Sequence, residues 1–125
     1  LDAATRARLR NNLIDFVAAD DTRVVIMASH RSEDLAGLAD RVIRVFDCDI
    51  SQPLLLDDAR TSFPVLTGRK EDVDKLIAGR DVIAAQSLGP TLRAQLAEPC
   101  DGADGVELSY PNDTELIDLL ATRKA

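Results

Sequence analysis

The sequence predicts an α/β fold in its first half and a small α+β unit in its second half. The first half reads as a helix, a short strand, a second helix and further strands, which is the alternation of an α/β sheet. Its strand is expected at residues 24–28, which are apolar at every position, as in a parallel-sheet strand covered on both faces. Near residue 57 the pattern changes to strand, helix, three strands and a last helix. We therefore expect two units, residues 1–56 and 57–125.

The composition is that of a globular chain of modest size. Of its 125 residues, 46% are hydrophobic and 30% are charged, which predicts a folded core rather than disorder. The 15 basic and 22 acidic residues give a net charge of -7. This balance argues against nucleic acids and anionic membrane surfaces as partners, because both require a basic face. We expect no membrane span and no signal peptide, since no apolar run approaches the roughly 20 residues of a span.

The cysteine and histidine content predicts no zinc site. Cys48 and Cys100 are the only cysteines, they lack CxxC spacing, and His30 is the only histidine. We expect two free thiols, with a disulfide as the alternative.

The elements of the first half follow from helical and strand periodicity. Residues 3–18 have apolar side chains on one helical face, at Leu9, Leu13, Phe16 and Val17. After the run 24–28, Ser32 is a suitable N-cap for a short helix that continues to Ala39, and its charged start is expected to be solvated. A strand at 41–46, a tight turn at 47–49 and a return strand from Ile50 complete this half.

The second half begins with a polar stretch, residues 57–62, that predicts a loop or linker. Strands are expected at 63–67, 81–86, 91–97 and 106–108, and a helix at 70–78. The strand at 91–97 alternates strictly, which predicts one buried and one solvated face. Asn112 and Glu115 form a capping-box pattern before a last helix, whose buried stripe is Leu116, Leu119 and Leu120.

His30 is the strongest single candidate for a functional residue. A lone histidine is more often structural or on the surface, but this one follows a buried-type strand, at the edge where open α/β sheets bind ligands. A neutral imidazole can donate one hydrogen bond to an anionic oxygen and accept another. A Ser-His-acid triad is disfavoured, because Ser29 is adjacent to His30 and the chain has no GxSxG elbow.

Several strings in the first half resemble the C-terminal part of an ABC-transporter nucleotide-binding domain, from its D-loop through its H-loop. They are Leu1-Asp2, the apolar run ending in Ser29-His30, and Ala39-Asp40-Arg41-Val42. The resemblance implies the C-terminal fragment of a P-loop NTPase (RecA-like) core. More weakly, residues 53–125 resemble the small extension of ATPases that serve ABC-2-type exporters, with Leu66-Thr67-Gly68 among the matching strings.

The resemblance implies roles for two residues. His30 matches the switch histidine, which in the family contacts the ATP γ-phosphate and helps to hold the attacking water. That role needs a donor aimed at charge developing on the transferred phosphoryl group. Asp2 matches the D-loop aspartate, which in the family reaches across a head-to-tail dimer. Ser29 is expected to be positional.

The implied function is that of an ATP-binding subunit coupling ATP hydrolysis to transport, with export favoured over import. The implied cofactors are ATP and Mg²⁺, whose ligands lie mostly outside this chain. The implied partners are a second ATPase subunit and a transmembrane permease, on the cytoplasmic face of the membrane, and no nucleic acid. GxxxxGK[ST], the signature and the Walker B pair are absent from the sequence and are expected before Leu1, so residues 1–125 alone are expected to be inactive.

Two further points remain open at the level of sequence. The alternative function is a stand-alone, non-enzymatic α/β regulatory or interaction module in which His30 is incidental. In addition, Cys48 stands where the family usually has glycine, in the turn after the Ala-Asp-Arg-Val strand. Either this turn has another geometry, or Cys48 carries the strain of a positive φ.

Overall fold

The computed structural model describes residues 2–122 and shows a mixed architecture of helices and antiparallel sheets. Leu1 of the Leu-Asp pair and residues 123–125 lie outside the described residues. The helices are α1 (Ala3–Ala18), α2 (Ser32–Leu35), α3 (Leu56–Arg60), α4 (Lys70–Ile77) and α5 (Asp113–Thr122). The strands are β1 (Arg41–Val42), β2 (Val45–Phe46), β3 (Asp49–Ile50), β4 (Leu54–Leu55), β5 (Val65–Arg69), β6 (Val82–Leu88), β7 (Thr91–Leu96) and β8 (Val106–Ser109).

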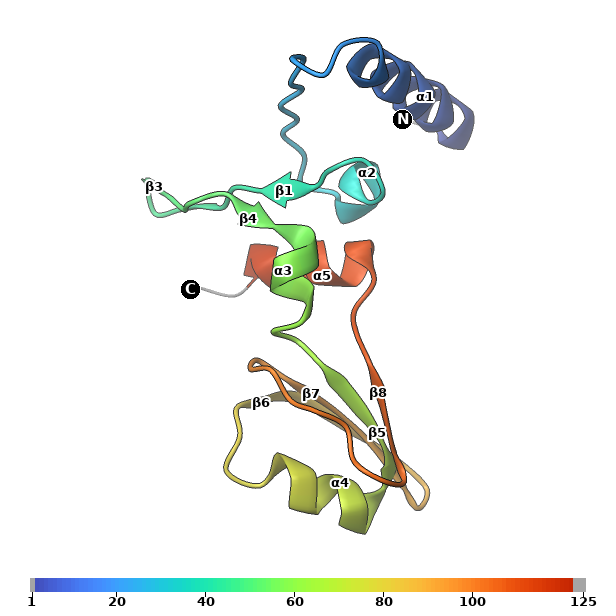
Figure 1. Cartoon of the computed structure of the whole chain (residues 1–125), viewed down its shortest axis with the longest axis vertical. Helices are drawn as coiled ribbons and strands as arrows, with labels where there is room; N and C mark the ends of the chain where they lie inside the picture. The colour runs from blue at the N-terminus through green and yellow to red at the C-terminus, as the bar shows by residue number, and fades with distance from the viewer. Residues whose placement is uncertain (1, 123–125) are drawn as a thin grey trace.

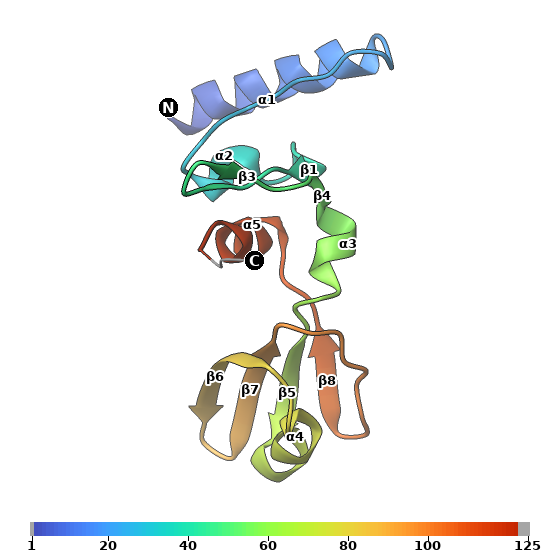
Figure 2. The same cartoon turned by 90° about the vertical axis from the view of Figure 1, so that its left-hand side faces the viewer.

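The elements form a stack (Figures 1 and 2). Helix α1 lies at one end, above a thin layer made by α2 and the short strand pairs β1–β4 and β2–β3. Helices α3 and α5 come next, and the four-stranded sheet with α4 on one face forms the other end. Helix α5 therefore returns to the middle of the stack after the chain has built the sheet.

The four-stranded sheet encloses the first of two apolar cores. Its order is β6-β7-β5-β8, with every neighbouring pair antiparallel. Leu66 of β5, Leu96 of β7 and Val73 of α4 are fully buried, because α4 covers this face of the sheet. Gly68 of β5 is required by close packing, since a Cβ there would lie 2.6 Å from the carbonyl oxygen of Gly105. The alternation predicted for residues 91–97 is confirmed, with Leu92, Ala94 and Leu96 buried.

The second core joins α5 to the elements of the first half. Its buried members are Leu56, Leu116, Ile117 and Leu120, and partly buried side chains around them include Leu35, Val42, Leu54 and Phe63. The predicted capping box begins α5: the Asn112 side chain accepts from the Glu115 N–H at 2.9 Å, and the Glu115 carboxylate accepts from the Asn112 N–H at 3.1 Å. This core draws side chains from both sides of the expected boundary at residues 56 and 57.

The strand predicted at residues 24–28 is wrong for the part of the chain that the structure describes. The run is extended but pairs with no strand, and Val24 and Ile26 are 79% and 89% exposed. It runs back along α1 (Figure 2), and Met27 is only partly exposed there. A parallel strand needs strands beside it and layers above and below it, and within residues 2–122 the run has only α1. All the strand pairs within residues 2–122 are antiparallel, so the predicted parallel sheet is absent from this part of the chain as well.

Other differences from the sequence reading are local. Residues 57–62 are not a loop, because α3 occupies most of them and turns Leu56 and Ala59 into the second core. The strand expected at 41–46 is divided into β1 and β2. The helix expected at residues 3–18 is present as α1, but its apolar face is not buried within the described residues, since α1 has no buried residue.

The turn between β2 and β3 resolves the alternative at Cys48. Phe46 pairs with Asp49, so Asp47 and Cys48 form the whole connection. Both have positive φ, 47° and 67°, as a type I′ hairpin turn requires. Cys48 therefore occupies the strained conformation that glycine adopts without penalty.

Cys48→Gly is expected to stabilise the chain by about 0.5–1 kcal/mol. Removing the Cβ relieves a left-handed penalty of about 1–2 kcal/mol, and part of this gain is offset by the larger entropy of glycine in the unfolded chain. Urea denaturation measures the difference. Asp49→Gly, which places glycine on the neighbouring strand at an ordinary φ, is the matched control and should destabilise. Equal destabilisation by both substitutions would contradict a left-handed Cys48.

Candidate functional site

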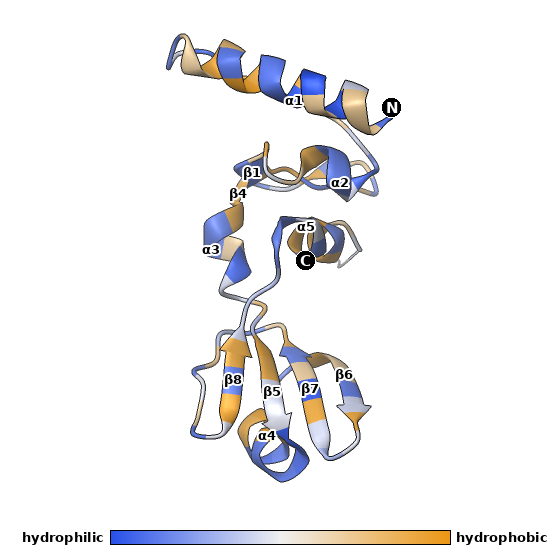
Figure 3. Cartoon of the chain, turned by 90° about the vertical axis from the view of Figure 1, so that its right-hand side faces the viewer, coloured by the Kyte–Doolittle hydropathy of each residue, from blue (hydrophilic) through white to orange (hydrophobic). Residues whose placement is uncertain are grey.

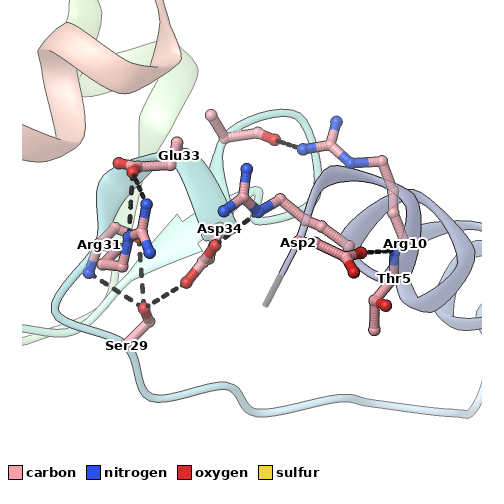
Figure 4. Close-up of polar contacts among 9 residues, drawn as sticks. Asp2, Thr5, Arg10, Ser29, Arg31, Glu33 and Asp34 are labelled. Carbon is pink, nitrogen blue, oxygen red and sulfur yellow. Dashed lines mark hydrogen bonds and ion pairs between the residues drawn. The ribbon is translucent and has the colours of Figure 1, made fainter.

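His30 lies in an exposed bend between the apolar run and α2. The bend is held by its neighbour Ser29, whose hydroxyl accepts a hydrogen bond from the Arg31 N–H at 3.0 Å. The same hydroxyl lies 3.2 Å from a carboxylate oxygen of Asp34, to which it donates. Figure 4 shows these contacts, which tie both neighbours of His30 to the start of α2. The positional role expected for Ser29 is consistent with this geometry, and the imidazole itself remains exposed.

Asp34 connects α2 to α1. Its carboxylate forms an ion pair with Arg6 of α1, with 2.9 Å between the nearest nitrogen and oxygen, and both side chains are largely shielded from solvent. One turn further along α1, the Arg10 guanidinium donates to the carbonyl oxygen of Ala36 at 2.6 Å. Arg31 and Glu33, by contrast, form an exposed pair at 2.7 Å. The solvated helix start expected from the sequence is therefore found at Arg31 and Glu33 but not at Asp34.

Asp2 has a local structural role in the described residues. Its carboxylate accepts a hydrogen bond from the Thr5 N–H at 2.7 Å and thereby caps α1 (Figure 4). This backbone hydrogen bond is the main reason why the pKa of Asp2 lies below its ordinary value. The carboxylate is exposed, and within residues 2–122 no hydrogen bond or ion pair joins it to His30.

The hollow between α1 and the apolar run is small. It has a volume of about 180 Å³ and is lined by residues that include Arg6, Leu9, Met27 and Ser29. Ligand pockets usually measure about 300–1,000 Å³. This hollow is therefore too small for a nucleotide, and His30 is not among the residues that line it.

A second carboxylate, Asp113, fixes the far end of α2. One oxygen of Asp113 accepts from the Gly37 N–H at 3.0 Å, and the other accepts from the Arg60 guanidinium. Arg60 also donates to the carbonyl oxygen of Pro111. The hydrogen bond from Arg60, followed by that from Gly37, lowers the pKa of Asp113 below its ordinary value.

The sequence reading identified Asp2, Ser29 and His30 but missed three of the residues that hold α2. Arg6 and Arg10 carried one signal that could have indicated them, because residues four apart lie on the same helical face. Asp113 carried none, since Gly37 lies 76 positions away in the sequence.

Within residues 2–122 there is no group of three histidine, cysteine or acidic side chains that could hold a metal ion. Both cysteines are free thiols. None of the helices in the described part of the chain combines the length and the apolar character needed to cross a membrane.

The stability contributed by Asp113 is expected to depend on pH. Because its folded-state pKa is depressed, its contribution is present above the unfolded pKa and is lost as the pH falls through the folded value. Asp113→Asn should therefore lower the free energy of unfolding by about 1–2 kcal/mol near pH 7, and the deficit should shrink below about pH 4. Urea denaturation at several pH values checks this, with the exposed Asp118→Asn as control. A deficit that is constant down to pH 3 would contradict the ion pair.

Neither protein-family models, nor curated proteins, nor solved structures gave a match to this chain.

Proposed function

We propose that this chain is part of the ATP-binding subunit of an ABC transporter, in which ATP hydrolysis drives transport and export is the favoured direction. The observation that carries the proposal is the position of His30, at an exposed bend that directly follows the apolar run and precedes α2. An imidazole held in this way by its two neighbours is free to meet an anionic oxygen of a bound nucleotide.

The exposed apolar surface of the first half supports the proposal. Val24 and Ile26 of the apolar run, Phe16 of α1 and Ile50 of β3 are all exposed. Figure 3 shows further apolar positions along α1, which has no buried residue. Exposed apolar surface of this extent is typical of a face covered by other protein. In the proposed subunit, the nucleotide-binding core would cover it.

In the proposed subunit, His30 donates a hydrogen bond to the terminal phosphate of ATP. A donor at this position stabilises the charge that develops on the transferred phosphoryl group and orients the attacking water. Asp2, exposed at the start of α1, is available to a second ATPase subunit in a head-to-tail dimer. The described residues do not fit a Mg²⁺ site, since no three candidate ligands gather among them.

His30→Ala is expected to lower ATP turnover of the complete subunit by about 10²–10³-fold, the usual loss when one aligned donor is removed. Folding should be unchanged, because the side chain is exposed and its removal opens no cavity. Steady-state hydrolysis and thermal unfolding are the measurements. Arg31→Gln, at the neighbouring exposed position, is the control and should retain turnover. Undiminished turnover in His30→Ala would remove His30 from the mechanism.

The alternative, a stand-alone regulatory or interaction module, is favoured by one observation: the four-stranded sheet and α4 enclose a core of their own, centred on Leu66, Val73 and Leu96. The reading frame upstream of Leu1 distinguishes the two. A Walker A motif and a signature motif there would favour the ATPase, and a start codon beside Leu1 would favour the module.

The 125-residue chain alone is expected to bind ATP only weakly, because it has no glycine-rich loop to surround the phosphates. Calorimetric titration with ATP and Mg²⁺ is the test. Submicromolar affinity would contradict the assignment of residues 1–56 to the end of a larger nucleotide-binding core.

A further inference from the structure

The turn that follows α2 is held by hydrogen bonds from two helices. Arg10 of α1 donates to the carbonyl oxygen of Ala36 at 2.6 Å, and Asp113 of α5 accepts from the N–H of Gly37 at 3.0 Å. The turn has little spare room: Gly37 has a φ of +78°, and a Cβ there would lie 2.8 Å from the Arg10 guanidinium. Helices α1 and α5, which are distant in sequence, thus bind two consecutive residues of this turn.

Helix α5 also supports α2 through apolar contact. Leu116, Ile117 and Leu120 of α5 are buried in the second core, and Leu35 at the end of α2 packs against this core. Arg60 of α3 binds the other oxygen of Asp113, so the start of α5 is fixed to α3 as well. Helix α2 is only four residues long and has no further turn to absorb a displacement of α5.

The His30 bend is connected to the same helix. Asp34, within α2, accepts from the Ser29 hydroxyl and pairs with Arg6 of α1. Ser29 in turn accepts from the Arg31 N–H, on the other side of His30. A movement of α2 therefore shifts both anchors of the bend that carries the imidazole.

We propose that α5 positions His30 through α2, and that Asp113 is the positioning residue. The contact between α5 and the turn after α2 does not depend on the proposed function. Only its consequence for ATP hydrolysis rests on that function.

Amide hydrogen exchange and NMR of the 125-residue chain test the mechanical coupling. In Asp113→Asn, the side chain offers one acceptor to two donors, so we expect at least tenfold faster exchange at Gly37. Ala36 and Ala39, whose N–H groups bond to Ser32 and Leu35, should exchange at least threefold faster. The His30 imidazole resonances should shift. Asp118→Asn, on the exposed side of α5, is the matched control and should change none of these signals.

A second variant distinguishes a local effect of Asp113 from simple unfolding of the chain. Arg60→Gln removes the other partner of Asp113 without altering α5, and it should give the same pattern with smaller amplitude. Amides of the distant sheet and of Arg80 beyond α4 should keep their chemical shifts in both variants, and their exchange should accelerate by no more than the global loss of stability requires, about fivefold to thirtyfold. Faster exchange confined to Gly37, or His30 resonances that stay unshifted in both variants, would overturn the proposal.

ATP hydrolysis by the complete subunit is the second test. Asp113→Asn should lower kcat for ATP about threefold to tenfold while KM changes less than twofold, because orientation of His30 and not nucleotide affinity is affected. Combined with His30→Ala, it should cause no further loss. An unchanged kcat, or additive losses, would overturn the coupling to hydrolysis. If the wild-type subunit hydrolyses no ATP, the proposed function fails, whereas the exchange measurements still decide whether α5 positions the bend.

Discussion

The packing of α2, α3 and α5 in the middle of the molecule depends on one carboxylate. Asp113 binds the N–H of Gly37 after α2 and the guanidinium of Arg60 in α3, two segments far from it in sequence. The leucines of α5 then complete a core that neither segment could build alone. A carboxylate with two donors is favourable here because both hydrogen bonds are charge-assisted, and the one from Arg60 is partly buried. Through this contact, the helix that follows the sheet becomes part of the layer that carries His30.

Much of the second half could be predicted from the sequence, and the reason is physical. Its strands pair with antiparallel neighbours, and α4 and α5 begin at local signals, so periodicity over a few residues carries most of the information. The strand order β6-β7-β5-β8, with β5 between β7 and β8, is not a local property and was not predicted. Helix α3 was missed because Asp57, Asp58 and Arg60 resemble a solvated loop, although Leu56 beside them is buried.

The first half shows the limit of the same reasoning. The apolar run at 24–28 has the composition of an interior strand, but a strand exists only with neighbours, and residues 2–122 provide none. Of the candidate site, His30 was indicated by its place directly after the apolar run, whereas Asp2 was indicated only by the family resemblance. The residues that hold the site together, Arg6, Arg10 and Asp113, act across long stretches of chain. The spacing of Arg6 and Arg10 places both on one helical face, but no local pattern reveals the partners of these three residues.

The late position of α5 in the chain has a consequence for synthesis on the ribosome. The chain is synthesised from its N-terminus, so α2, β1, β4 and α3 leave the ribosome well before α5. Until α5 emerges, Leu35, Val42 and Leu56 lack the leucines that cover them in the finished molecule. The layer that carries His30 is therefore completed only when α5 has emerged, and until then its uncovered apolar side chains are accessible to chaperones and proteases.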